Sequence, residues 1–267
     1  MKKPPAPRTL PDPWWSGFGD PMLGALVASA RWNAADAPSA PPLETQVAAA
    51  WASAKSDIVA LDLIADAQFA MRRQCELLYA WKLESELVAP RLAMLAQRRD
   101  EAEQTARAIS RRRDTAINLL ACLCGQTTEA VERMIVSTPD ELRIPRFLGH
   151  LPLANADVLM ALPNGRTETR AIRNTLAGMH VENQRREALS HEAVETCGTF
   201  HRLVASVRMD AADEFEALER YQQLILLSRQ LAAIDGALAL SWVALVNLLG
   251  ESRPARRHTA LWTCFAP

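Results

Sequence analysis

The segment His191-Glu192-Ala193-Val194-Glu195 comes closest to a catalytic motif in this sequence. In zinc peptidases, H-E-x-x-H places two histidines four residues apart on one face of a helix, where both bind the metal and the glutamate acts as general base. Here glutamate stands at the position of the second histidine. Because the histidine pair that would hold zinc is absent, we expect no metal site at this segment.

The cysteines form no pattern that binds a metal or predicts a disulfide framework. They are Cys75, Cys122, Cys124, Cys197 and Cys264. Their number is odd, no two are spaced as C-x-x-C, and most lie in apolar helical segments. Cys122 and Cys124 are two residues apart on a predicted helix, so their side chains point to different faces and cannot bridge easily. We therefore expect buried thiols.

Other sequence patterns of enzymes are also absent. The chain has no glycine-rich phosphate loop, nucleophile elbow, serine–histidine–acid arrangement or Glu-x-x-His motif. Its 30 basic and 31 acidic residues are balanced, and the basic runs Arg72-Arg73 and Arg111–Arg113 have acidic neighbours, which argues against a nucleic-acid partner. The sequence therefore predicts no enzyme, and no catalytic, cofactor-binding or metal-binding residue.

Apolar residues at helical spacing predict long helices in the N-terminal half. Leu43–Ala89 contains neither glycine nor proline, which predicts an unusually long helix. After Pro90, a series with a mean spacing of about 3.5 residues, the period of a coiled coil, runs toward Gly125. Its members are Leu92, Leu95, Arg99, Ala102, Ala106, Ile109, Arg113, Ala116, Leu120 and Leu123. Since proline inside a helix costs about 3 kcal/mol, we expect a turn at Lys82–Pro90 and antiparallel pairing of the two helices.

A second pair of helices is predicted in the C-terminal half. One is expected from Arg166 to about Arg220 and the other from Gln223 to Leu249, with a turn at Tyr221–Leu224. Gly125 and Gly250 each follow an apolar helix end, as glycines that end helices do. The predicted fold class is all-α, with long antiparallel helical hairpins in two repeats, a coiled-coil bundle with no recognisable β-barrel.

The sequence predicts three consecutive parts. Residues 1–42 are expected to form an N-terminal arm with a short amphipathic helix and a proline-rich linker. Residues 43–250 are expected to form the two-repeat helical-hairpin domain, with an irregular connector at 126–165. Residues 251–267 are expected to form a flexible tail.

Features of export and membrane insertion are not found. Lys2 and Lys3 are followed by prolines where a signal peptide needs an apolar segment, and Cys75 comes too late for a lipid-attachment site, so we expect neither a signal peptide nor a lipobox. Arg229 and Asp235 interrupt the most apolar helix, so we expect no direct spanning of a membrane.

The residues Trp14–Asn33 form the strongest signature in the chain. An aromatic turn precedes Asp20 and Pro21, which suit the cap and first position of a helix, and Leu23, Leu26, Val27 and Ala30 then fall on one helical face. This order, W-W-x-x-F-x-D-P-x-L-x-x-L-V-x-x-A-x-x-N, resembles the start of mature outer-membrane factors. These are the TolC-like exit ducts, often lipoproteins, of RND-type tripartite efflux systems.

Further segments resemble this family to different degrees. Arg112–Gly125 is similar to the end of its first helical hairpin, and Ala233–Gly250 to the end of its second. Leu151–Asn164 resembles in part the connector L-P-x-D-L-L-x-R-P-D between its two repeats. In this chain, Leu162 replaces the arginine of that connector, and Thr169 stands where a glutamate usually follows it.

The resemblance predicts a shortened family member. Each protomer of the family has four membrane-spanning strands, and none is recognisable here, because only the linker Ala35–Leu43 and the helical segment Ala177–Arg186 stand where the strand pairs belong. The resemblance implies a component of an efflux duct that transports small molecules, forms a homotrimer at the outer membrane or in the periplasm, and binds a periplasmic adaptor and an inner-membrane pump. The alternative is a soluble coiled-coil interaction protein or a non-conducting remnant of that family.

Overall fold

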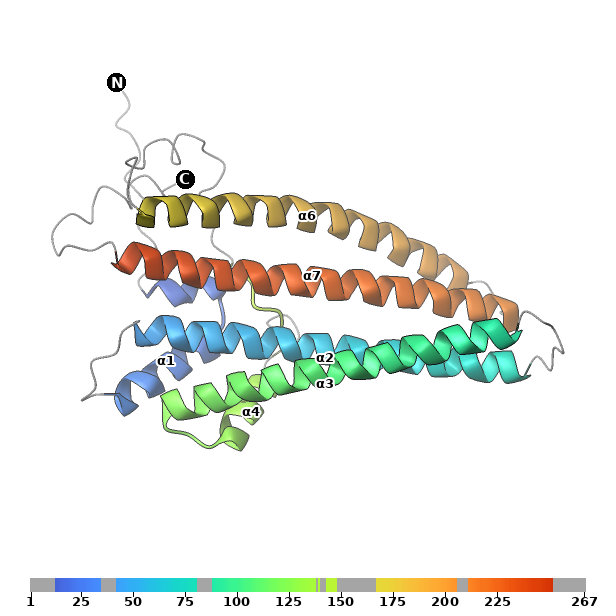
Figure 1. Cartoon of the computed structure of the whole chain (residues 1–267), viewed down its shortest axis with the longest axis horizontal. Coiled ribbons are helices and arrows are strands. Elements are labelled where there is room, and N and C mark those ends of the chain that lie inside the picture. The colour runs from blue at the N-terminus through green and yellow to red at the C-terminus, as the bar shows by residue number, and fades with distance from the viewer. Residues whose placement is uncertain are drawn as a thin grey trace, which may run out of the picture. The chain divides into compact units, whose positions relative to one another are not determined.

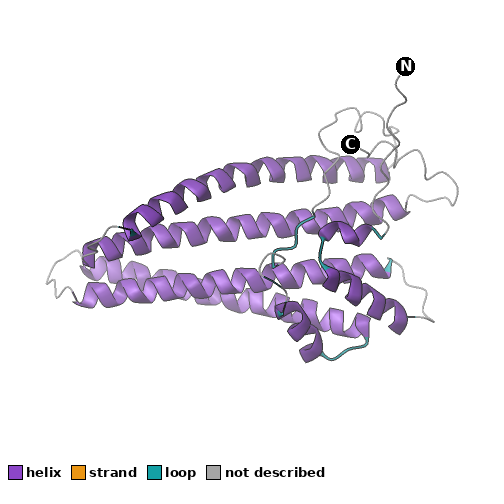
Figure 2. Ribbon diagram, turned by 180° about the vertical axis from the view of Figure 1, so that it is seen from behind, coloured by secondary structure: helices purple, strands orange, loops and turns teal. Residues whose placement is uncertain are grey.

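The computed structural model describes residues 13–34, 42–80, 88–137, 139, 143–147, 167–205 and 211–251. Within these ranges every regular element is helical, and Figure 2 shows no strand among them. The elements, which can be followed in Figure 1, are a 3₁₀ helix η1 (Trp14–Phe18) and the α-helices α1 (Pro21–Asn33), α2 (Leu43–Ala80), α3 (Val88–Cys124), α4 (Thr128–Val136), α6 (Thr167–Val204) and α7 (Ala211–Glu251). The predicted all-α fold class is confirmed, and the division into two repeats stays a prediction.

Several predicted helix ends are wrong. Helix α3 begins at Val88, so Pro90 lies in its first turn, where the N–H that proline lacks would have no acceptor within the helix. Helix α6 ends at Val204 and α7 begins at Ala211, which places Tyr221–Leu224 inside α7. Residues 205–210 contain neither glycine nor proline, but Asp210 directly precedes α7, and Asp213 and Glu214 lie in its first turn, as is typical of helix starts. Helix α7 also continues through Gly250 to Glu251.

The connector predicted to be irregular contains the short helix α4. The Thr127 side chain accepts a hydrogen bond from the backbone N–H of Ala130 at 3.3 Å and caps this helix, while Val131 and Ile135 are buried. The rest of the predicted connector, including the family-like segment Leu151–Asn164, lies outside the described residues. Residues 35–41, 81–87 and 252–267, on which most of the predicted linker, of the predicted turn at Lys82–Pro90 and of the predicted tail falls, lie outside them as well, and so does Cys264.

The chain divides into two compact units whose segments are distant in sequence. Unit 1 takes its residues from 1–55, 115–184 and 235–267, and unit 2 takes its residues from 56–114 and 185–234. The four long helices each contribute to both units. The division into an N-terminal arm, a two-repeat domain and a tail stays a prediction, because periodicity shows how far a helix extends and not which segments pack together.

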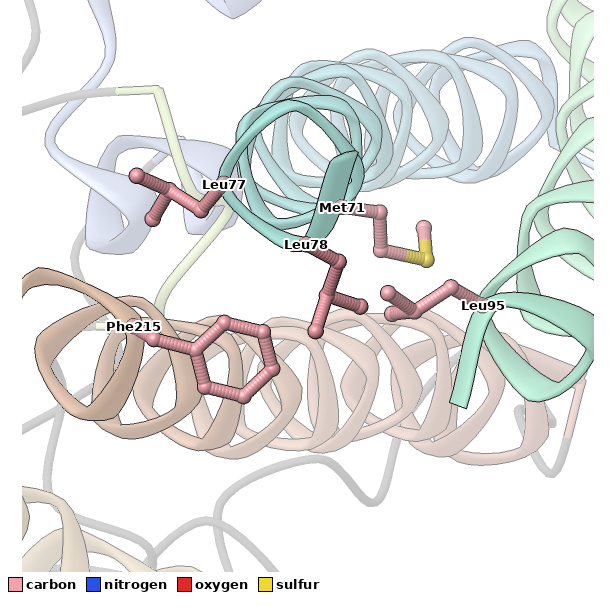
Figure 3. Packing of buried hydrophobic residues seen from close by; sticks show 5 residues of the cluster. All are labelled: Met71, Leu77, Leu78, Leu95 and Phe215. Carbon is pink, nitrogen blue, oxygen red and sulfur yellow. The ribbon is translucent and has the colours of Figure 1, made fainter. Parts of the chain in front are cut away.

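The core of unit 2 joins α2, α3 and α7. Figure 3 shows Leu78 of α2 close to Phe215 of α7, while Met71 of α2 and Leu95 of α3 point toward one another. Asp57, near the start of the part of α2 in unit 2, forms an ion pair with Arg112, near the end of the part of α3 in unit 2. In unit 2, α2 and α3 therefore run antiparallel.

The apolar series predicted in α3 does form its buried face. Leu95, Ile109, Ala116 and Leu120 are buried, and Arg99 is exposed. The remaining members, Leu92, Ala102, Ala106, Arg113 and Leu123, are partly buried. The coiled-coil spacing thus identified the face of α3 that packs against other helices, and the rest of α3 is mostly exposed.

Helix α7 is long and apolar enough, over Ala212–Leu248, to cross a membrane by length and composition. Buried core helices of water-soluble proteins pass the same test. Arg229 and Asp235 therefore do not exclude α7 as a membrane-spanning helix by composition. The sequence-based argument against such a helix was wrong on this point. Asp235 is buried and binds Arg146 at 2.8 Å, so this charged position has a protein partner.

Leu120 and Leu119 offer a matched test of the α3 core. Leu120 is fully buried and Leu119 is 46% exposed, one residue away on the same helix. Leu120→Asp should lower the free energy of unfolding by several kcal/mol, because it buries an unpaired charge, whereas Leu119→Asp should change it by about 0.5 kcal/mol or less. Urea unfolding followed by circular dichroism measures both values. Equal losses in the two variants would contradict the assignment of the buried face.

Candidate functional site

Asp20 makes the two polar contacts that hold the start of α1 in unit 1. One carboxylate oxygen accepts a hydrogen bond from the backbone N–H of Met22 at 2.8 Å, so the predicted helix cap is confirmed. The other oxygen accepts a hydrogen bond from the Lys55 ammonium group of α2 at 2.6 Å, and the two side chains are 3% and 1% exposed. Burial lowers the pKa of Lys55, while the hydrogen bond and charge of Asp20 act in the opposite direction. The sequence pattern did not predict this buried ion pair.

The Trp51 ring lies next to this ion pair and belongs to a cluster of aromatic side chains. Phe18 of η1 is buried and meets the Trp51 ring of α2 edge to face, with 5.2 Å between ring centroids. The Lys55 ammonium group lies 5.2 Å from the centroid of the same indole ring. At the periphery, the Arg31 guanidinium lies 4.9 Å from the Trp15 ring and binds Glu44 at 2.8 Å. The predicted aromatic turn is therefore part of the core of unit 1.

The short segment 143–147 joins this aromatic cluster to α7. The Phe147 ring stacks on Trp242 at a centroid distance of 3.9 Å and meets Phe18 at 5.4 Å. It also lies so close to Gly17 that a Cβ atom there would be 2.3 Å from the ring. A Cβ atom at position 17 would therefore require the Phe147 ring to move.

Gly125 ends α3 with a backbone arrangement known as a Schellman motif. Its φ of 62° lies in the left-handed region that favours glycine, as the sequence predicted. The N–H of Gln126 donates to the carbonyl of Ala121 at 3.0 Å, and the N–H of Gly125 donates to that of Cys122 at 3.4 Å. These bonds leave the carbonyl groups of Leu123 and Cys124 without a backbone donor of this motif.

Side chains of α1 complete the capping of α3. The Ser29 hydroxyl donates to the carbonyl of Cys124 at 3.0 Å. The Asn33 amide donates to the carbonyls of Cys122 and Leu123 at 3.3 and 3.2 Å. All four carbonyl groups of the last turn of α3 thus accept a hydrogen bond, although helix ends leave such groups unpaired within the helix. The last residue of the signature, Asn33, therefore acts as a cap for another helix.

The residues that suggested metal chemistry lie on a solvent-exposed face. His191 Nδ1 and Glu195 Oε1 of α6 are 3.8 Å apart, and both side chains are largely exposed. Among the residues that the structure describes, no group of three or more histidine, cysteine or acidic side chains is placed to hold a metal ion. The arrangement of His191 and Glu195 is that of an ordinary i, i+4 pair on a helix surface.

The cysteines differ from the expectation of buried thiols. Cys124 is buried, donates a weak hydrogen bond to the carbonyl of Leu26 at 3.4 Å and has a pKa that burial raises. Cys122 is exposed, and Cys75 and Cys197 are half-buried. All four are free thiols. The prediction is thus right for Cys124 and wrong for Cys122, because the α3 seam buries only one face of the helix.

These features define an all-α helical protein in which an N-terminal helix is fixed to two longer helices by a buried ion pair and by side-chain caps. No protein-family model matches the sequence, and no curated protein is significantly similar to it. The resemblance to outer-membrane factors therefore rests on the residues themselves.

The Asp20–Lys55 pair can be tested by a double-mutant cycle. Asp20→Asn keeps a side chain that can cap α1 but removes the negative charge that binds the buried Lys55 ammonium group, so the free energy of unfolding should fall by about 3 to 5 kcal/mol. Adding Lys55→Met should restore part of that loss, which urea unfolding measures. The exposed pair supplies the control, since Arg31→Ala should cost about 1 kcal/mol or less. Additive losses from Asp20→Asn and Lys55→Met would contradict the coupling.

Cys122 and Cys124 should differ in reactivity at neutral pH. Only the thiolate reacts with alkylating reagents, and burial both shields Cys124 and raises its pKa. Iodoacetamide should therefore modify Cys122 in the folded protein and spare Cys124, as measured by mass spectrometry of peptides. In the unfolded protein both should react, which controls for accessibility. Similar rates for the two thiols in the folded protein would show that Cys124 is not buried.

Proposed function

We propose that this chain is a helical component of a TolC-like export duct. In this role, copies of the chain line a path for small molecules across the cell envelope, together with a periplasmic adaptor and an inner-membrane pump. The family resemblance implies a homotrimer. The chain contributes through the shape and assembly of its helices, and no catalytic step is assigned to it.

The observation that carries this proposal is the packing of the Trp14–Asn33 signature. Each half of the signature has a structural role in unit 1: Phe18 and Asp20 bind residues of α2, while Ser29 and Asn33 cap α3. The apolar positions between them, Leu23, Leu26, Val27 and Ala30, are fully or almost fully buried. A sequence match alone does not explain why both halves of the signature contact the long helices α2 and α3. This packing supports the view that the resemblance reflects a shared way of attaching the N-terminal helix to the long helices.

The long helices also suit a role in assembly. Helix α3 buries one seam and exposes most of its remaining surface. Along this surface, Gln97 donates to Glu101 at 2.8 Å and Arg107 donates to Glu103 at 2.5 Å. Such i, i+4 contacts stabilise a helix that has few neighbours. In a duct whose wall is one helix thick, each helix would expose such polar surfaces on both sides of the wall.

The same polar surface favours the second candidate, a soluble coiled-coil interaction protein. Charged i, i+4 pairs on an exposed helix are typical of helices that face water. In that case the bundle would bind other proteins through its helices and would have no part in transport.

Cell fractionation distinguishes the two candidates. The full chain, produced in its native host with a C-terminal epitope tag, should be found with the outer membrane and should migrate at three times the protomer mass after mild cross-linking. A second measurement is co-purification of a periplasmic adaptor, because a duct component must bind one. A tagged outer-membrane porin and a cytoplasmic enzyme serve as markers of the fractions. Recovery in the soluble fraction, without an adaptor, would contradict the export role and support the second candidate.

A further inference from the structure

The C-terminal half of α6 contributes little to the core of unit 2. Of its residues 185–204, all of which the structure describes, only Thr196 is buried. The core cluster around Leu78, part of which Figure 3 shows, takes its buried and partly buried members from α2, α3 and α7. Because buried apolar area is the main source of stability, this half of α6 is held more weakly than its neighbours.

The same segment also has low intrinsic helix stability. Gly198 is the only glycine in the sequence ranges of unit 2, and glycine inside a helix lowers the helix equilibrium about fivefold relative to alanine. A Cβ atom at this position would meet no packing neighbour within 4 Å, so close packing does not call for glycine here. Nearby Val194, Thr196 and Thr199 are β-branched and lose side-chain freedom in a helix. The Thr199 hydroxyl donates to the carbonyl of Glu195 at 3.1 Å, a contact that often bends helices.

An aromatic contact joins this segment to α7. The centroid of the Phe200 ring lies 5.6 Å from that of the Tyr221 ring. Both residues are half-buried, so the contact shields part of each ring from solvent. Burial raises the pKa of the Tyr221 hydroxyl, and the negative charge of Asp66 acts in the same direction. Phe200 is therefore a side chain through which α6 covers part of α7.

Helix α3 is also mostly exposed in unit 2, but it is held more firmly. Leu95 belongs to the core cluster, and Val88 and Leu92 pack against that cluster. Arg112 forms an ion pair with Asp57, which is buried on α2. The part of α3 in unit 2 contains no glycine. The combination of little burial and a weak helical sequence is therefore particular to α6.

We propose that residues 185–204 of α6, called here the strap, detach from α7 and lose their helical hydrogen bonds locally, then close again, while α2, α3 and α7 stay packed. Local opening of this kind occurs where a segment has few buried contacts, and it requires less free energy than global unfolding. Opening uncovers the Tyr221 ring, and closing brings Phe200 back onto it. The strap thus controls solvent access to this part of α7. This inference does not depend on the export role.

Hydrogen–deuterium exchange of the full chain, followed by mass spectrometry of peptides, tests the proposal. Amides of the strap should exchange at least about tenfold faster than those of residues 217–227 in α7, because they exchange through local opening. Low concentrations of urea should speed exchange in α7 but barely change it in the strap, since local opening exposes little surface. Equal protection and the same urea dependence in the two segments would overturn the proposal.

A core substitution separates opening of the strap from unfolding of the whole unit. The Leu95 side chain is packed whether the strap is closed or open. Leu95→Ala should therefore speed exchange in residues 217–227 at least about tenfold, because it makes global unfolding easier, and should leave exchange in the strap unchanged. Circular dichroism checks that this variant folds. An equal increase in both segments would show that the strap opens only with the rest of the unit, which contradicts the proposal.

Two glycine substitutions form a matched pair that does not weaken the core. A Cβ atom at position 198 of α6 or at position 24 of α1 would meet no packing neighbour within 4 Å. Gly198→Ala should slow exchange in the strap about fivefold, because alanine favours the helix, whereas Gly24→Ala should leave it unchanged. Phe200→Ala should speed exchange in the strap about tenfold, because the contact with Tyr221 is lost. The same strap exchange in both glycine variants, or no effect of Phe200→Ala, would overturn the proposal.

Discussion

The buried ion pair between Asp20 and Lys55 is the interaction on which the arrangement of unit 1 depends. One oxygen of the carboxylate caps α1, and the other pairs with the ammonium group that Lys55 buries in unit 1. An unpaired charge in a protein interior costs several kcal/mol, so α1 cannot leave α2 without a large loss of stability. The pair fixes where the chain enters the helical core, and Phe18, Trp51 and the segment 143–147 pack around that point.

Neighbouring elements satisfy polar groups that single helices leave unpaired. The end of α3 is completed by Ser29 and Asn33 of α1, and buried Asp235 of α7 is neutralised by Arg146. In the signature Trp14–Asn33, apolar positions therefore face the core, while the polar positions Asp20 and Asn33 reach other helices. Because each of these positions has a defined packing partner, the fixed order of the twenty residues can identify how the N-terminal helix packs on the long helices.

Neither proposed role of this protein requires a reacting group, because both place function on helix surfaces. The face of helix α2 that includes Leu78 carries the core of unit 2. Within the described residues, the positions with the most definite chemistry, such as Asp20 and Lys55, stabilise the fold.

The sequence by itself determined the fold class, the cap of α1 at Asp20, the buried seam of α3 and its end at Gly125, because these depend on residues close together along the chain. The sequence analysis did not identify α4, although Thr127 is a preferred capping residue, or the start of α7 at Ala211, although Asp210 precedes it and Asp213 and Glu214 lie in its first turn. Only the tertiary structure decided that Lys55 meets Asp20 and that Arg146 meets Asp235, over separations of 35 and 89 residues. Periodicity shows which face of a helix is buried, but which helix covers that face depends on how the whole chain packs.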